Sequence, residues 1–170
     1  GRAHETIVVD DGSGDHTAEV LAKLAAKGLP VRHLRHDRSC GQSRAVRTGV
    51  FSARGDVVAT IDGDGQNDPA DIPALLATYR AAPDQGRLMI AGHRRRRRDG
   101  IVKRVSSRIA NAVRARALGD GTPDTGCGLK LFPRQSFLEF PAFDHMHRFL
   151  PALMIRAGGR VISEDVSHRA

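Results

Sequence analysis

The stretch DVVATIDGDGQNDPADIPALLATYRAA, residues 56–82, decides the fold because it joins an apolar strand, an acidic turn and a helix without a break. Residues 56–61 are a short run rich in β-branched side chains, which is typical of a buried strand. Residues 69–82 are predicted to form a helix that Asp68 caps. Between the two lie alternating side chains that offer oxygen ligands: Asp62, Asp64, Gln66 and Asp68. This concentration of carboxylates at the end of a buried strand indicates a ligand site.

Apolar runs and helical segments alternate along the rest of the chain as well. The alternation predicts an α/β fold, in which a mostly parallel sheet has helices on both faces, built as one domain over residues 1–170. Strands are expected at residues 5–9, 31–36, 56–61, 87–92, 126–133 and 160–166, and helices at residues 16–28, 41–55, 69–82, 103–119 and 147–159.

Three of the expected strands end in polar clusters. Asp10 and Asp11 follow the first strand, Asp62 and Asp64 follow the third, and the next strand leads into the arginine run at residues 94–98. Parallel strands bring their carboxyl ends to one edge of a sheet, and ligands of open α/β sheets bind outside that edge. We therefore expect two acidic clusters and a basic one to share a cleft. Most of the arginine run itself is expected to be a solvated loop.

The composition is that of a soluble globular protein with a basic balance. Of the 170 residues, 40% are hydrophobic and 27% are charged, and the formal net charge is +8. This charge favours anionic partners without choosing among nucleotides, nucleic acids and phospholipid headgroups. The two cysteines, Cys40 and Cys127, form neither a metal-type pair nor a disulfide framework, so we expect a reducing, cytosolic setting. No apolar run approaches the ~18 residues of a membrane span.

The acidic turn has three interpretations. Carboxylates two residues apart can hold one Mg²⁺ ion, which keeps water and substrate phosphates in its remaining positions. A calcium loop of the EF-hand type fits less well, because Asn67 and Pro73 stand where that loop needs Gly and Glu. The third interpretation is a solvated turn that only caps the following helix.

Two motifs in this order carry a resemblance to a known family. The segment IVVDDGSGDHT, residues 7–17, followed by the stretch at residues 56–76, resembles the nucleotide-sugar half of a family 2 glycosyltransferase with the GT-A fold. Within that family the chain is most similar to the polyprenyl-phosphate sugar transferases of the dolichol-phosphate mannose synthase type. The likeness continues through KRVSSRIANAV and DTGCGLKLFPR and covers nearly all residues. It implies a Rossmann-like, three-layer α/β/α architecture. It also implies an N-terminally truncated domain that begins after the first strand of the fold and stops within a basic loop.

The resemblance assigns roles to individual positions. Asp11, with Asp10 beside it, matches the contact to the nucleotide. Asp62, Asp64 and Gln66 match the ligands of a Mg²⁺ or Mn²⁺ ion on the diphosphate. The positions matched to the reacting sugar and the acceptor phosphate are Asp64, Asp124, Arg104, Arg148 and His147, and the start of a terminal basic loop matches His168 and Arg169.

The function implied is metal-dependent, inverting transfer of a sugar from a UDP- or GDP-sugar to an acceptor, namely a polyprenyl or dolichyl phosphate. The enzyme would lie peripherally at the cytoplasmic face of the membrane and bind no nucleic acid. A phosphate acceptor is already anionic at pH 7, so it needs positioning by arginines more than it needs a strong base. Two alternatives from other classes stay open at this point: a basic nucleic-acid-binding module, and a phosphohydrolase that uses an aspartate nucleophile.

Overall fold

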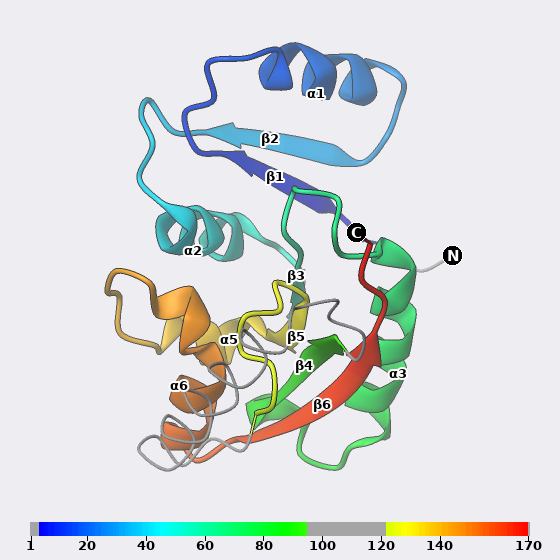
Figure 1. Cartoon of the computed structure of the whole chain (residues 1–170), viewed down its shortest axis with the longest axis vertical. Coiled ribbons are helices and arrows are strands. Elements are labelled where there is room, and N and C mark those ends of the chain that lie inside the picture. The colour runs from blue at the N-terminus through cyan, green and yellow to red at the C-terminus, as the bar shows by residue number, and fades with distance from the viewer. Residues whose placement is uncertain (1–3, 95–121, 170) are drawn as a thin grey trace, which may run out of the picture.

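A computed structural model describes residues 4–94 and 122–169 of the chain (Figure 1). Helices and strands alternate through most of it, as the sequence predicts. The strands are β1 (Thr6–Asp10), β2 (Val31–Arg35), β3 (Val57–Thr60), β4 (Leu88–Arg94), β5 (Lys130–Pro133) and β6 (Arg160–Val166). The α-helices are α1 (Thr17–Ala26), α2 (Gln42–Ser52), α3 (Ile72–Ala81), α5 (Arg134–Leu138) and α6 (Leu150–Arg156), and the short 3₁₀ turns are η1 (Pro69–Asp71), η2 (Gln85–Arg87) and η3 (Met146–Arg148).

The helix expected at residues 103–119 lies outside the described residues. The short helix α5 was not expected from the sequence. No helix within residues 4–94 and 122–169 is both long and apolar enough to cross a bilayer.

The described strands form two sheets. Strand β1 pairs with β2 in parallel, from Thr6 opposite Val31 to Asp10 opposite Arg35. The other sheet has the order β3-β5-β4-β6, in which β4 and β6 are parallel while β5 runs antiparallel to both of its neighbours. In Figure 1 the β1–β2 pair and α1 lie at one end of the molecule, the four-stranded sheet lies at the other, and α2 lies between them. The four-stranded sheet is therefore mixed, whereas the sequence predicted a mostly parallel one.

Helices cover both faces of the four-stranded sheet, and the pleat of the strands divides its core in two. Leu129 and Leu131 of the β5 segment and Ile90 of β4 pack on the side of α3. Phe132 of β5 and Met89 of β4 point to the other side, where α5 and α6 lie (Figure 1). Successive strand residues face opposite ways, so a run such as GLKLF supplies both cores at once.

The second core is built around stacked aromatic rings. Phe137 of α5 is fully buried. Its ring stacks on Phe132 with centroids 5.4 Å apart and lies 6.1 Å from Phe140. Aromatic rings bury large apolar areas and add specific ring contacts, so α5 anchors the chain to this face of the sheet despite its length of five residues.

Phe137→Ala is expected to lower the free energy of unfolding by about 3–5 kcal/mol, because it removes a buried ring and leaves a cavity. The matched control is Leu29→Ala, whose side chain is 48% exposed and whose loss should cost no more than about 0.5 kcal/mol. Urea unfolding of the three chains measures the difference. Equal destabilisation by the two changes would contradict this account of the core.

Candidate functional site

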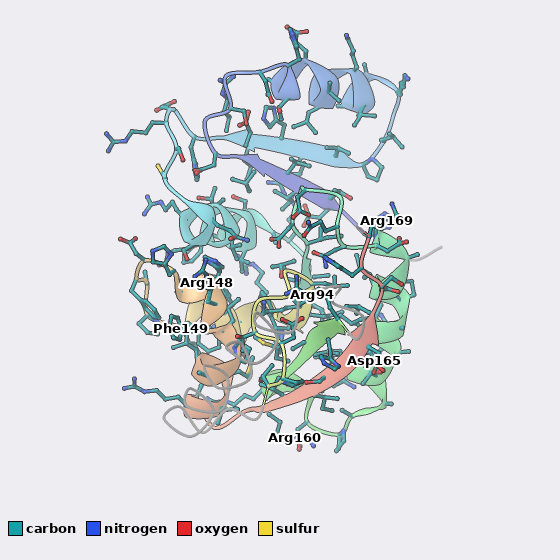
Figure 2. The ribbon with its side chains drawn as sticks, viewed as in Figure 1. Arg94, Arg148, Phe149, Arg160, Asp165 and Arg169 are labelled. Carbon is teal, nitrogen blue, oxygen red and sulfur yellow. The ribbon has the colours of Figure 1, made fainter. Side chains whose placement is uncertain are left out.

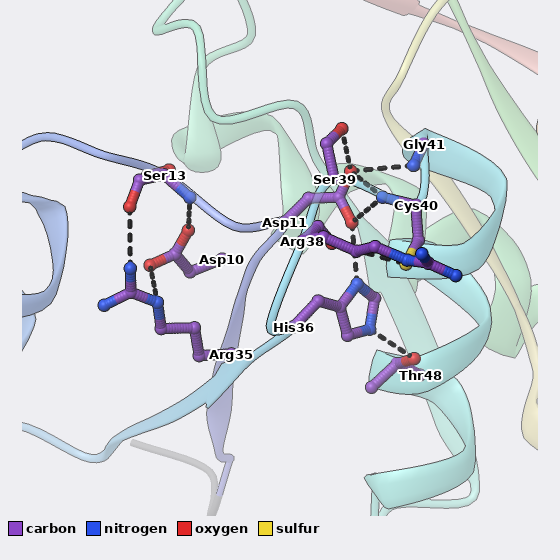
Figure 3. Close-up of polar contacts among 10 residues, drawn as sticks. All are labelled: Asp10, Asp11, Ser13, Arg35, His36, Arg38, Ser39, Cys40, Gly41 and Thr48. Carbon is purple, nitrogen blue, oxygen red and sulfur yellow. Dashed lines mark hydrogen bonds and ion pairs between the residues drawn. The ribbon is translucent and has the colours of Figure 1, made fainter.

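Asp10 closes the end of β1 and shapes the turn that follows. Its side chain is buried, and Oδ1 accepts the backbone N–H of Ser13 at 2.7 Å. Oδ2 lies 3.7 Å from Nε of Arg35 (Figure 3). It also lies 3.5 Å from Nε2 of His33. The hydrogen bonds from Ser13 are the main reason why the pKa of Asp10 is lowered. Asp10 thus points back under its own turn, toward β2.

Asp11 fixes the loop that leads from β2 into α2. Its carboxylate accepts the backbone N–H groups of Cys40, at 2.9 Å, and Gly41, at 2.7 Å. His36 Nδ1 lies 2.6 Å away and the Ser39 hydroxyl donates at 3.0 Å (Figure 3). Burial alone would raise the pKa of Asp11, but these hydrogen bonds outweigh it and lower the pKa to about 2. The carboxylate is therefore charged throughout the physiological range.

The first turn of α2 connects the two acidic motifs. The Gly41 amide, immediately before the helix, is bound to Asp11, and the next residue, Gln42, donates from Nε2 to Oδ1 of Asp62 at 2.7 Å. Asp62 follows the end of β3. The end of β1 and the end of β3 thus meet at the start of α2, although they belong to different sheets.

A cavity of about 360 Å³ opens beside Asp62. Three of the side chains expected at the site line it: Asp62, Asp124 and Arg148. His147 lines it too, and its Nδ1 is hydrogen-bonded to the Ser43 hydroxyl at 2.8 Å. Burial lowers the pKa of His147, so the ring is neutral at pH 7. The other lining residues come from α2, the end of β3, the segment that leads into β5, and the start of α6: Gln42, Val46, Thr60, Ile61, Thr125, Gly126, Cys127, Gly128, Lys130 and Leu150.

Asp64, Gln66 and Arg169 do not line the cavity. Asp64 is in the exposed turn after β3, where its Oδ1 accepts the backbone N–H of Gln66 at 3.0 Å. The carbonyl of Gln66 accepts the amide of Arg169 at 2.9 Å, which places the C-terminal residues beside this turn (Figure 2). Arg104 lies outside the described residues.

Two further cations lie at the site: Arg94, from the arginine run that was expected to share the cleft, and Lys130, which was not expected from the sequence. Arg94, the last residue of β4, makes a two-point contact with Asp124, from Nε at 2.7 Å and from Nη2 at 2.9 Å. It belongs to a strand and an ion pair, so it departs from the solvated loop expected for the arginine run. Lys130 is only 4% exposed, and its ammonium donates to the carbonyl of Cys127. Burial lowers the pKa of Lys130, while nearby Asp62 and Asp124 oppose that shift.

The alternation of strand residues could have indicated Lys130. In GLKLF the leucines face one core, so Lys130 must share the other face with Phe132. A lysine on a buried strand face needs a special role or a partner. No sequence pattern distinguishes Arg94 from the four identical residues that follow it, so its individual role could not be predicted.

The sequence model of the family described as "Glycosyl transferase family 2" matches residues 2–140. The chain belongs to glycosyl transferase family 2. The family and its GT-A fold, both predicted from the sequence, are confirmed. The match to this family, together with the relatives and solved structures described next, supports the glycosyltransferase hypothesis. It supports neither the nucleic-acid-binding nor the phosphohydrolase alternative.

Among curated members of glycosyl transferase family 2, the chain is 34% identical over 170 residues to a dodecaprenyl-phosphate galacturonate synthase of Rhizobium johnstonii, covering 98% of the chain and 49% of that protein. It is 38% identical over 154 residues to an undecaprenyl-phosphate 4-deoxy-4-formamido-L-arabinose transferase of Pseudomonas paraeruginosa, covering 90% of the chain and 44% of that protein. The chain spans about half the length of these curated relatives.

Solved structures show the same fold. A mannosyltransferase from Pyrobaculum calidifontis, in complex with GDP-Man and Mn²⁺, superposes with a TM-score of 0.66 at 21% identity, over 95% of this chain and 45% of that one. A mannosyl-3-phosphoglycerate synthase from Rubrobacter xylanophilus gives 0.69 at 18% identity, over 98% and 57% of the two chains.

Asp11→Asn tests the clamp on the loop before α2. The folded pKa of about 2 lies below the ordinary value of 3.8, so the charged carboxylate stabilises the fold above about pH 4, and this contribution is lost as the pH falls through about 2. At pH 7 we expect the substitution to lower the free energy of unfolding by about 1–2 kcal/mol.

Urea unfolding at several pH values measures this difference between Asp11→Asn and the unchanged chain. The difference should shrink toward zero as the pH falls from about 4 to about 2. The control is Asp84→Asn, at a carboxylate that is 75% exposed. It should produce no comparable difference in the free energy of unfolding. If the free energy of unfolding of Asp11→Asn differs from that of the unchanged chain by the same amount at the lowest pH, the role of the charge is contradicted.

Gly128→Ala tests the close approach that positions Asp62. A Cβ at Gly128 would overlap the Asp62 carboxylate, whereas a Cβ at Gly86 meets no atom within 4 Å. We expect Gly128→Ala to lower the free energy of unfolding by about 1–3 kcal/mol, because the carboxylate or the backbone must move. Gly86→Ala should change it by less than about 0.5 kcal/mol, and similar losses in the two chains would refute the contact.

Proposed function

We propose that this chain is the nucleotide-sugar-binding part of a transferase that moves a sugar from a UDP- or GDP-sugar to a polyprenyl phosphate. The observation that carries the proposal is the cavity, where carboxylates from two segments, Asp62 and Asp124, face the cations Lys130 and Arg148. The relatives named as dodecaprenyl- and undecaprenyl-phosphate enzymes support the class of acceptor. The acceptor is a lipid, so the reaction would take place at the membrane surface, on the cytoplasmic face.

The acidic turn fits a divalent cation. Oδ1 of Asp62 is bound to Gln42, and no hydrogen bond from residues 4–94 or 122–169 occupies Oδ2. Asp64 and Gln66 stand in the adjoining exposed turn, from which their side chains would approach the same ion. Mg²⁺ and Mn²⁺ suit such a site, since Mg²⁺ takes few protein carboxylates and completes its shell with water and phosphate oxygens. When bound, the ion would neutralise charge on the leaving diphosphate.

The cations of the cavity suit two anionic substrates. Arg148 is exposed at the cavity wall, in the last position of η3 (Figure 2), and a guanidinium can hold a phosphate through two parallel hydrogen bonds. Lys130 lies deeper and would place a positive charge close to the developing negative charge on the diphosphate. A cation held in place in a partly buried cavity stabilises charge more than one in bulk water.

Asp124 would position groups rather than remove a proton. Its two oxygens are both engaged by Arg94, and a neighbouring guanidinium favours the charged carboxylate. The phosphate acceptor needs no strong base, because it is already an anion. Its attack on the anomeric carbon, on the side opposite to the diphosphate, would invert the configuration of the sugar.

A titration with a panel of UDP- and GDP-sugars, in the presence of Mn²⁺ or of a chelator, tests the proposal. One donor should bind in the micromolar range only with metal, and Asp62→Ala and Asp64→Ala should each weaken its binding by more than about tenfold, since each removes a charged ligand. Asp84→Ala, which changes an exposed carboxylate immediately before η2, should bind the donor normally. Binding of equal strength with and without metal would count against the proposal.

A further inference from the structure

The cavity beside Asp62, proposed to bind the sugar donor, is called the donor cavity below. A second, smaller cavity lies behind one wall of the donor cavity. Its volume is about 200 Å³, and its lining includes Ser43, Arg44 and Arg47 of α2 together with the loop at residues 142–146. The wall consists of α2 and η3, joined by the hydrogen bond between Ser43 and His147. His147 lines the donor cavity and Ser43 lines the second one. Nothing in the proposed sugar transfer uses this second cavity.

The charge in the second cavity is mostly positive. Two arginines line it against one aspartate, Asp144, and no ion pair within 4.0 Å joins Asp144 to either arginine. Arg47 is partly buried, and its Nη1 meets no hydrogen-bond acceptor in the described part of the chain. A guanidinium that is partly desolvated and incompletely paired is costly, and a bound anion would offset that cost.

Exposed aromatic rings flank these arginines. The guanidinium of Arg47 lies over the ring of Phe51, 4.5 Å from its centroid, and Phe51 is 47% exposed. Phe143, on the opposite wall, is 43% exposed, and its ring lies 6.0 Å from that of Phe149. Residues 141–145 are all exposed. In Figure 2, Phe149 lies with Arg148 at the edge formed by α2 and α6, away from Arg169 and Asp165.

Arginines beside exposed phenylalanines suit a phospholipid surface. The guanidinium groups match the headgroup phosphates, and aromatic rings bury in the boundary between headgroups and acyl chains. A soluble phosphate would use the arginines but would leave both rings in water. The pairing of the two chemistries therefore favours a lipid over a free anion.

We propose that the second cavity binds the phosphate of an anionic phospholipid through Arg44 and Arg47, while Phe51 and Phe143 enter the membrane interface. This site is separate from the donor cavity and goes beyond the proposed function. It attaches the domain to the bilayer through lipids that the reaction does not consume.

Co-sedimentation of the full chain with vesicles tests the site. Vesicles of phosphatidylcholine that contain phosphatidylglycerol should bind the chain, whereas vesicles of phosphatidylcholine alone should bind it weakly. The double change Arg44→Gln and Arg47→Gln should weaken binding to the anionic vesicles about thirtyfold, since each surface arginine contributes about fivefold. Phe143→Ser should weaken it about fivefold or more.

The matched control is Arg160→Gln, at an exposed arginine of β6 on another part of the molecule (Figure 2), which should alter vesicle binding far less than the double change does. Equal losses in the control and in the double variant would overturn the proposal, because any basic patch would then explain the binding. Arginine-dependent binding of inorganic phosphate without vesicle binding would overturn it too. Vesicle binding should be the same in Asp62→Ala, so the outcome is independent of the donor titration.

Discussion

The start of α2 is held by the hydrogen bonds that the Asp11 carboxylate accepts at the end of β1. The loop before α2 has to present the Cys40 and Gly41 amides to that carboxylate, and the helix then starts with Gln42 aimed at Asp62. Backbone N–H groups at the start of a helix lack partners within the helix, and an anion near them is favoured by the helix dipole. The Asp11 carboxylate thereby ties the end of β1 to the start of α2, and Gln42 ties the start of α2 to Asp62 after β3.

The donor cavity adds a second constraint, which is the balance of charge in a partly buried space. Asp124 and Arg94 form a two-point ion pair at the wall, and Lys130 is buried within reach of the fields of Asp62 and Asp124. Buried charges persist only when they are paired or hydrogen-bonded. Each of these groups therefore fixes the position of the others, and the cavity keeps its polar lining without collapse. Such preorganised charge is what an enzyme needs where a diphosphate leaves.

The sequence predicted local structure well, because the local signals were strong. The apolar runs gave five strands to within about two residues of their ends, and Asp68 caps its turn by accepting the Ala70 amide, as expected. Strand direction and strand partners were not predictable, since the apolar alternation of a run such as GLKLF is the same in either direction. The antiparallel pairing of β5 with β3 and β4 therefore had no signal in the sequence. At the site, the motifs indicated Asp62, Asp124 and Arg148, and the arginine run was expected nearby, but the ion pair of Arg94 with Asp124 is a contact across the fold that leaves no local pattern.

Helix α2 also explains why two different cavities lie side by side. Residues four apart share a face of a helix, so Gln42 and Val46 line the donor cavity while Ser43 and Arg47 line the arginine-rich one. Phe51 continues the second face by one further turn. A rigid helix keeps these faces at a fixed angle, and the Asp11 clamp fixes the helix itself. If lipid phosphate occupies the second face, the donor cavity is held at a constant height and orientation above the bilayer. An acceptor whose phosphate stays at the membrane surface can then reach the sugar without the domain having to search for it.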